Sequence, residues 1–194
     1  KGFLPMSHGI TLSRNQCPKT VDERVQMSGV PYASTIGSIM HAMICTRPDV
    51  SYALSVSSRY QSDPGVAHWT IVKNILKYLR RTKDMLLVYG GDEELVVNGY
   101  TDASFMTDID DYKSQSGYVF TLNGGTVVCK SFKQNTIADS TTEVEYIATL
   151  EASKEAFWIK MFLEEIGVVP SVMNPMPLYF DNSGALAQAK EPRS

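Results

Sequence analysis

Apolar residues change their spacing once along this chain, next to Gly90-Gly91, and that change restricts the folds available to it. Before this point they recur every three or four residues, which is typical of amphipathic helices. The helical pattern covers residues 31–45, 48–60 and 66–81, with a turn at Asp63-Pro64-Gly65. Helices joined by such short loops predict a small helical bundle.

After the two glycines the pattern becomes that of strands. Two β-prone runs, residues 117–122 and 126–132, flank Asn123-Gly124-Gly125, which is a strong signal for a β-hairpin. A long helical pattern over residues 140–166 and a short strand at 178–180 follow. With an earlier strand ahead of the hairpin, the expected order is helices first, then β-β-β-α-β-α.

This order predicts two domains, a helical region over residues 1–90 and a strand-containing region over residues 91–194. The fold class is α/β, or α+β over the whole chain: a small helical bundle, then a mixed sheet with flanking helices. Residues 1–90 hold 11 Lys and Arg against 5 Asp and Glu, whereas residues 91–194 hold 7 against 16. A basic part beside an acidic part fits a region that grips nucleic acid beside one that binds metal; two unrelated solvated surfaces would give the same numbers.

The three cysteines, Cys17, Cys45 and Cys129, are widely spaced and form no Cys-x-x-Cys pair. This argues against a disulfide framework and indicates ordinary thiols in a reducing, intracellular compartment. His41 and Cys45 lie four residues apart on a predicted helix, but helix packing explains them better than a metal because no second ligand pair is in view. No apolar run reaches the roughly 18 residues of a membrane span, so no membrane partner is expected.

Three acidic residues stand where a strand–helix–strand frame would bring them together. Asp102 and Asp181 each end a short β-prone run, and Glu145 lies near the start of the long helical pattern. Carboxylates that converge without basic partners repel one another, and a bound divalent cation is the usual remedy. Oxygen ligands of this type suit Mg²⁺ or Mn²⁺. The first interpretation is metal-assisted phosphodiester chemistry; taken singly, each acid is more often a turn or cap residue.

Glu143 competes with Glu145 for the helical position in this set. Residues two apart on an α-helix differ by about 200° of rotation, so both cannot face the same metal site. Ser140 or Thr141 can cap the helix, and Glu143 is suited to a capping box with either of them. Glu145 is therefore preferred as the ligand and Glu143 as the capping residue.

Other polar residues are candidates for contact with a nucleic-acid backbone. The basic residues of the helix over 66–81 share its outer face, where phosphate contact and a simple solvated face are both open interpretations. Small polar residues near the acids are also candidates, although each is a common turn residue. The basic set is Lys73, Lys77, Arg80 and Arg81, and the small polar set is Ser104, Ser116 and Asn182.

The long helix is also expected to bury most of its apolar residues. Its aromatic residues are interpreted as core rather than as a base-stacking surface. The expected buried residues are Ile147, Leu150, Ala152, Ala156, Phe157, Trp158, Ile159, Phe162 and Leu163.

Four motifs of the second domain resemble the ribonuclease H domain of copia-type long-terminal-repeat retrotransposon polyproteins. They are Tyr-Thr-Asp-Ala-Ser (100–104), Asp-Asp-Tyr-Lys-Ser-Gln-Ser-Gly-Tyr-Val-Phe (110–120), Ser-Thr-Thr-Glu-Val-Glu-Tyr-Ile-Ala (140–148) and Tyr-Phe-Asp-Asn-Ser-Gly-Ala-Leu (179–186). The first domain is similar to the segment that follows the reverse-transcriptase palm, which is the thumb and connecting part of related polymerases. Its motifs are Pro-Tyr-Ala-Ser-Thr-Ile-Gly-Ser-Ile-Met (31–40), Thr-Arg-Pro-Asp-Val-Ser-Tyr-Ala (46–53) and His-Trp-Thr-Ile-Val-Lys-Asn-Ile-Leu-Lys-Tyr-Leu (68–79).

The resemblance implies a ribonuclease H-like sheet and an endonuclease that cuts the RNA strand of RNA–DNA hybrids with two Mg²⁺ ions, for which Mn²⁺ substitutes. It makes Asp102 the first-strand carboxylate, Glu145 the first-helix carboxylate and Asp181 the fourth-strand carboxylate. The implied partners are the hybrid and the polymerase part of the same polyprotein, in a cytoplasmic virus-like particle or the nucleus. The family's fourth carboxylate, final strand and final helix are expected beyond Ser194. An inactive remnant that binds nucleic acid or docks on the polymerase is the alternative.

Overall fold

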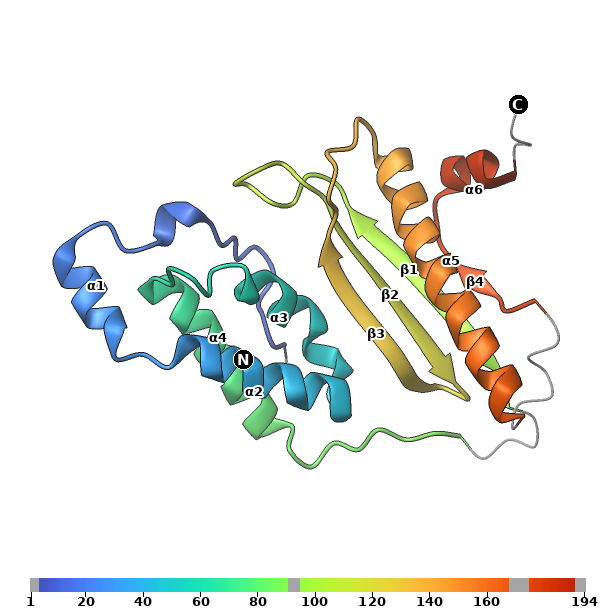
Figure 1. Cartoon of the computed structure of the whole chain (residues 1–194), viewed down its shortest axis with the longest axis horizontal. Helices are drawn as coiled ribbons and strands as arrows, with labels where there is room; N and C mark the ends of the chain where they lie inside the picture. Colours follow the sequence, from blue (N-terminus) through green and yellow to red (C-terminus); the bar gives the residue numbers. More distant parts are fainter. Residues whose placement is uncertain (1–3, 91–94, 168–174, 191–194) are drawn as a thin grey trace. The chain divides into compact units, whose positions relative to one another are not determined.

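The structure is a computed structural model that describes residues 4–90, 95–167 and 175–190 (Figure 1). Helices come first and the strands follow, in the order that the apolar spacing predicts. The α/β class with a mixed sheet is therefore confirmed. Among the described residues, no helix combines the length and the hydropathy that a membrane span requires.

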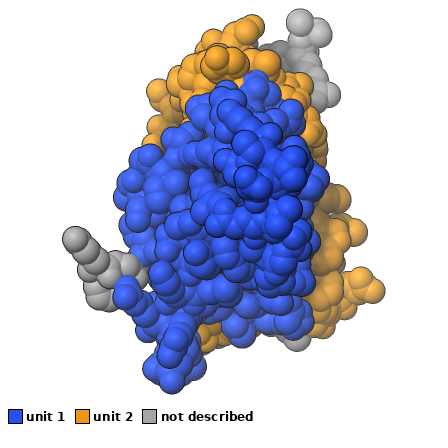
Figure 2. Space-filling view, turned by 90° about the vertical axis from the view of Figure 1, so that its left-hand side faces the viewer, with its two compact units in different colours: residues 1–86, 109–111 blue, residues 87–108, 112–194 orange. Residues whose placement is uncertain are grey.

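The chain divides into two compact units, which Figure 2 shows in different colours. Unit 1 contains residues 1–86 and 109–111, and unit 2 contains residues 87–108 and 112–194. Each unit has an apolar core of its own. The expected division into domains at residues 1–90 and 91–194 stays a prediction.

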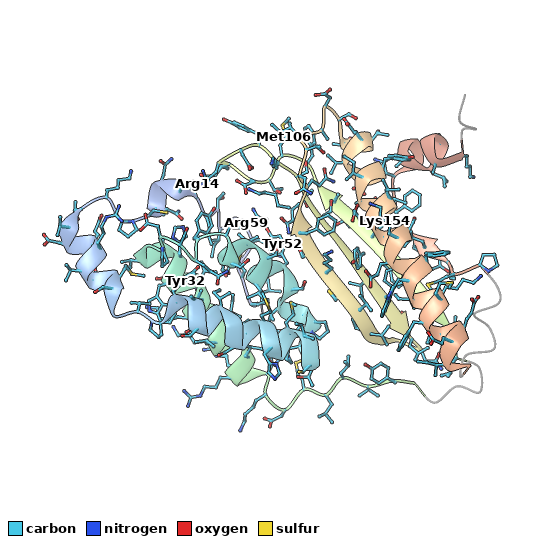
Figure 3. All side chains as sticks on the ribbon, in the orientation of Figure 1. Arg14, Tyr32, Tyr52, Arg59, Met106 and Lys154 are labelled. Carbon is cyan, nitrogen blue, oxygen red and sulfur yellow. The ribbon has the colours of Figure 1, made fainter. Side chains whose placement is uncertain are left out.

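Unit 1 forms the expected small bundle, in which α2, α3 and α4 pack against one another. The apolar stripe of α4 is buried in its core, with Val72 and Ile75 fully inaccessible. Tyr32, labelled in Figure 3, closes the bundle by donating a 2.8 Å hydrogen bond from its buried hydroxyl to the Ser57 carbonyl. The helices are α1 (Val21–Ser28), α2 (Tyr32–Cys45), α3 (Ser51–Ser58) and α4 (Val66–Arg81), with 3-10 turns η1 (Arg14–Gln16) and η2 (Pro48–Val50).

The helix predicted over residues 48–60 is shorter than expected. Pro48 opens the 3-10 turn η2, and the α-helical part covers only Ser51–Ser58. Proline has no N–H to donate, and its ring favours the first position of a helical turn. Pro48 therefore begins a tight 3-10 turn ahead of the helix and does not lie within it.

His68, in the first turn of α4, is a fully buried ionisable residue. Its Nδ1 accepts a 2.9 Å hydrogen bond from the Gly65 N–H, so the ring proton lies on Nε2, which donates to the Ser13 carbonyl at 3.1 Å. The ring also stacks on Tyr60, with 4.0 Å between centroids. Burial lowers the pKa of His68 and outweighs the Ser13 carbonyl and nearby carboxylates, which raise it.

Unit 2 is a four-stranded mixed sheet in the order β3-β2-β1-β4. β1 pairs antiparallel with β2 and parallel with β4, and β2 pairs antiparallel with β3. Helix α5 packs against β1 and β2, and α6 packs against α5 (Figure 1). The bounds are β1 (Val97–Ser104), β2 (Gln115–Leu122), β3 (Gly125–Lys133), α5 (Thr141–Ile166), β4 (Leu178–Tyr179) and α6 (Ser183–Lys190).

Local signals place the turns of unit 2 where the sequence predicts them. Asn123 and Gly124 both adopt positive φ, 45° and 82°, as a tight hairpin turn between right-twisted strands requires. Gly167 ends α5 in the left-handed conformation with φ 71°. Gly99 on β1 is needed for close packing, because a Cβ there would lie 2.5 Å from Phe120 and 2.9 Å from Leu178.

The prediction that the aromatic residues of α5 are buried is wrong. Phe157 is 68% exposed and Trp158 57%, and Trp158 stacks on Phe162, which is also exposed. Leu150 is exposed as well. Successive helical residues turn by about 100°, and apolar residues occur all round this helix, so spacing alone does not select the face that meets the sheet. The face that does so carries Val144, Ala148, Ala152 and Ile159.

Candidate metal centre

Two of the three predicted acids lie towards the carboxyl ends of adjacent parallel strands, Asp102 within β1 and Asp181 just after β4. In the pairing of β1 with β4, Gly99 faces Leu178 and Tyr100 faces Tyr179. Asp102 and Asp181 each stand two residues beyond the tyrosine pair, so they occupy matching positions: Asp102 inside β1, two residues before its last residue, and Asp181 two residues after β4. The carboxyl ends of parallel strands meet at one edge of a sheet, and this places the two carboxylates together.

The third acid comes from the first two turns of α5, where Glu143 and Glu145 have different surroundings. Ser140 Oγ accepts a 3.2 Å hydrogen bond from the Glu143 N–H, and the exposed Glu143 carboxylate accepts one of 2.8 Å from the Asp139 N–H. Glu143 thus serves the capping of α5. Glu145 lies on the buried side of the helix, as the helical rotation between the two residues predicts.

Asp102, Glu145 and Asp181 converge. One carboxylate oxygen of each lies within 4.8 Å of those of the other two. Asp102 and Asp181 are exposed, whereas only 7% of Glu145 is exposed. In the part of the chain that the structure describes, none of the three forms an ion pair with lysine or arginine. The cluster therefore gathers negative charge and opens to solvent on the side of the two aspartates.

Burial and the neighbouring charges of the cluster act most strongly on Glu145. Its Oε1 accepts a 3.3 Å hydrogen bond from the Ala103 N–H, and its Oε2 is buried without a hydrogen-bond partner among the described residues. Burial raises the pKa of Glu145, and the charges of Asp102 and Asp181 raise it further, against the opposing effect of the Ala103 N–H. A buried oxygen without a partner is costly unless something binds it.

These residues fit a divalent cation. Carboxylate oxygens are the ligand type that Mg²⁺ and Mn²⁺ prefer, and these three side chains each bring one such oxygen within 4.8 Å of the others. A cation would supply a partner for Glu145 Oε2 and would neutralise the repulsion.

Of the small polar candidates, Ser104 is exposed at the end of β1, close in sequence to Asp102. Asn182 caps α6, since its Oδ1 accepts a 2.9 Å hydrogen bond from the Ala185 N–H. The interpretation of Ser116 as a backbone contact is wrong, because this residue is 1% exposed and its Oγ accepts a hydrogen bond from Gln134. Strand burial, which the local sequence does not show, explains the difference.

The basic candidates lie in unit 1, whereas the three acids lie in unit 2. All four of them are exposed on α4, as expected for an outer helix face: Lys73, Lys77, Arg80 and Arg81. His41 and Cys45 are both exposed on α2, with 3.7 Å between Cys45 Sγ and His41 Nε2.

Two contributors to the site were not predicted. The Ala103 N–H that binds Glu145 is a backbone group, which no side-chain pattern reveals. Gln134 lies buried directly after β3 and donates to the Val144 carbonyl, next to Glu145 in the chain. A single glutamine after a strand carries no signal of burial, so only the tertiary structure identifies it.

No protein-family model matches the chain, and no solved structure matches it either. A retrovirus-related Pol polyprotein from transposon TNT 1-94 of Nicotiana tabacum is 48% identical over 164 residues, which are 84% of this chain and 12% of the polyprotein. One from transposon RE2 of Arabidopsis thaliana is 35% identical over 154 residues, 79% of this chain and 10% of the polyprotein. The chain is thus similar to a segment of retrovirus-related Pol polyproteins from plant transposons.

The resemblance to copia-type Pol polyproteins is thus confirmed at the level of the polyprotein. The chain spans 12% of the length of the tobacco polyprotein and 10% of that of the Arabidopsis polyprotein. The assignment to the ribonuclease H domain stays a prediction. Secreted RxLR effector protein 161 of Plasmopara viticola is also similar, with 45% identity over 135 residues, 69% of this chain and 94% of that protein.

Proposed function

We propose that unit 2 of this Pol polyprotein segment is a divalent-cation-dependent endonuclease that cleaves the RNA strand of RNA–DNA hybrids during reverse transcription. One observation supports this most: Asp102, Glu145 and Asp181 bring their carboxylate oxygens within 4.8 Å of one another, and Glu145 Oε2 is buried without a partner in the described part of the chain. The polyprotein family supplies the context in which such hybrids arise.

Two Mg²⁺ ions, or Mn²⁺ in their place, would activate a water for attack on the phosphodiester and stabilise the leaving oxygen. Asp102 stands on β1, where it pairs with Gly117 of β2, so its backbone is held in the sheet. Glu145 is the buried member of the three, and the Ala103 N–H binds its Oε1, so Oε2 would be the oxygen available to hold a metal. Asp181 and Asp102 are exposed, which leaves room for a phosphate group on their side.

The substrate would be held mainly through sugar and phosphate. A 2′-hydroxyl distinguishes RNA from DNA, and backbone contacts give weak sequence preference with strong salt dependence. Ser104, which is exposed two residues after Asp102, is a candidate contact in unit 2, together with Asn182. The four exposed basic residues of α4 are candidate phosphate contacts, and the polymerase part of the polyprotein is the proposed protein partner.

The test is cleavage of a labelled RNA strand in an RNA–DNA hybrid, with Mg²⁺ and with EDTA. We expect cleavage only with Mg²⁺, none by Asp102→Asn, and near wild-type cleavage by Glu143→Gln, whose side chain caps α5 outside the centre. Duplex DNA and duplex RNA are the substrate controls. Equal cleavage by wild type and Asp102→Asn would exclude this site. A longer segment of the polyprotein, assayed in parallel, tests whether a further carboxylate beyond Ser194 is needed.

A second candidate function rests on the basic face of α4. Lys73, Lys77 and Arg80 are exposed together, so unit 1 has the charge to bind a nucleic-acid backbone whether or not the centre in unit 2 is active. In that case the chain would be a non-catalytic binding or polymerase-docking module. Hybrid binding that survives Asp102→Asn, with no cleavage by the wild type, would favour it.

A further inference from the structure

A buried amide joins the sheet to the first turn of α5. Gln134 directly follows β3, and only 2% of it is exposed. Its Nε2 donates two hydrogen bonds, one of 2.8 Å to Ser116 Oγ on β2 and one of 2.9 Å to the Val144 carbonyl. Its own N–H donates to the Ser114 carbonyl at 2.9 Å, which fixes the backbone of Gln134 beside the start of β2. One side chain therefore ties β2 and α5 to the end of β3.

The hydrogen bond from Gln134 to the Val144 carbonyl affects the metal centre, because Val144 directly precedes Glu145 in the chain. A movement of the Val144 carbonyl carries Glu145 with it, since the two residues share one turn of a hydrogen-bonded helix. The Glu145 carboxylate is fixed separately by the Ala103 N–H from β1. Glu145 is thus held at its backbone through Gln134 and at its side chain through Ala103.

Stability alone explains Gln134 poorly. Its Oε1 is buried and has no hydrogen-bond partner among the described residues. An unpaired buried carbonyl costs free energy, and an apolar side chain of the same length would remove that cost, while leaving Ser116 Oγ without the donor that Gln134 supplies. What an apolar side chain would not provide is the directional bond to the Val144 carbonyl.

We propose that Gln134 is a positioning residue for the metal centre: by binding the Val144 carbonyl it sets where Glu145 meets Asp102 and Asp181. The inference rests on the proposed function, since it requires that the three carboxylates bind a divalent cation. Gln134 contacts neither metal nor substrate in this arrangement. Mutation of a group that holds a metal ligand in place without contacting the metal typically weakens metal affinity by about 10- to 100-fold.

The experiment compares Gln134→Met with Tyr118→Phe in the full 194-residue chain. Tyr118→Phe is the matched control, because it removes another sheet-to-α5 hydrogen bond, of 2.9 Å to Glu155, far along the helix from the centre. The Mn²⁺ dissociation constant is measured by electron paramagnetic resonance of free Mn²⁺, and folding is checked by circular dichroism. We expect Gln134→Met to weaken Mn²⁺ binding about tenfold and Tyr118→Phe to leave it unchanged.

Each outcome decides the inference. Folded Gln134→Met with wild-type Mn²⁺ affinity overturns it and leaves the proposed function standing, whereas no Mn²⁺ binding by the wild type overturns both. If Gln134→Met does not fold, Gln134→Asn takes its place, since its amide is one methylene shorter and cannot reach both Ser116 and Val144. A tenfold loss in that folded variant supports the inference, and unchanged affinity contradicts it.

Discussion

The backbone N–H of Ala103 donates a 3.3 Å hydrogen bond to Oε1 of Glu145, and this bond joins the end of β1 to the first turns of α5. It satisfies only one of the two carboxylate oxygens, and the other is buried without a partner in the described residues. Asp102 and Asp181 add negative charge on the open side. In the absence of a cation, these three carboxylates therefore destabilise unit 2.

Glu145→Gln should stabilise unit 2 when EDTA is present at neutral pH. The folded pKa of Glu145 is raised, so the folded state holds the proton more strongly than the unfolded state. Stability is then lost as the pH rises from the unfolded pKa through the folded one. The uncharged variant escapes this loss, so its advantage should be present at pH 7 and disappear below about pH 4, where wild-type Glu145 is protonated in both states. Urea unfolding across this range measures it, and a wild type that is more stable than the variant at pH 7 in EDTA would contradict the electrostatic assignment.

His68 should make the stability of unit 1 depend on pH in the opposite sense. Its folded pKa is lowered, so between the folded and unfolded values the unfolded state binds more protons. Stability is present above the unfolded pKa of about 6.5 and falls as the pH drops below it. Protonation also places a proton on Nδ1, which now accepts from Gly65. As the pH drops from 7.5 to 5.5, the free energy of unfolding should fall in the wild type and fall less steeply in His68→Gln. Equal slopes in the two proteins would contradict the role given to His68.

Two glycine-to-alanine changes should have opposite effects. Gly99→Ala should destabilise unit 2 by about 1–3 kcal/mol, because the added methyl overlaps Phe120 and Leu178 in the centre of the sheet. Gly37→Ala should stabilise unit 1 by about 0.5–1 kcal/mol, because Gly37 lies within α2 with nothing within 4 Å of the new Cβ. Chemical denaturation of both variants measures the pair. Similar changes in the free energy of unfolding for the two variants would contradict the packing described around Gly99.

If α4 contacts a nucleic-acid backbone, removing its charge should change the salt dependence of binding. Lys73→Ala combined with Lys77→Ala should weaken hybrid binding and reduce the slope of log affinity against log salt by roughly 0.9 for each phosphate that the variant no longer neutralises. Lys154→Ala on α5, where Lys154 pairs with Glu151, is the control and should leave the slope unchanged. Filter binding over a range of salt concentrations gives both values. An unaltered slope in the double variant would assign these lysines to a solvated face.

The sequence predicts best what local chemistry determines. The helix over residues 66–81 has the expected bounds, and Ser140 and Gly167 cap α5 as their residue types indicate. Asp102 and Asp181 could be paired in advance because each follows a short apolar run that is visible in the sequence. Their convergence with Glu145 within 4.8 Å is a tertiary result, since it depends on the parallel register of β1 with β4.

What the sequence does not show depends on burial. Helix α5 is apolar on several sides, so nothing in its spacing predicts that Phe157 is exposed while Ala152 is buried. Gln134 and Ser116 are polar residues that the sheet and helix enclose, and their burial arises from elements distant in the chain. The supporting contacts of the centre are therefore found only in three dimensions.

Binding of Mn²⁺ to the metal-free chain, followed by paramagnetic broadening of backbone NMR signals, tests the central claim most directly. Broadening falls steeply with distance from the ion, so it locates the site without requiring catalysis. In the wild type we expect the signals of Asp102, Glu145 and Asp181 to disappear first. In Asp102→Asn, the signals of Glu145 and Asp181 should remain visible at the same Mn²⁺ concentration. Broadening centred on other acidic residues, or none at all, would contradict a metal centre formed by these three carboxylates.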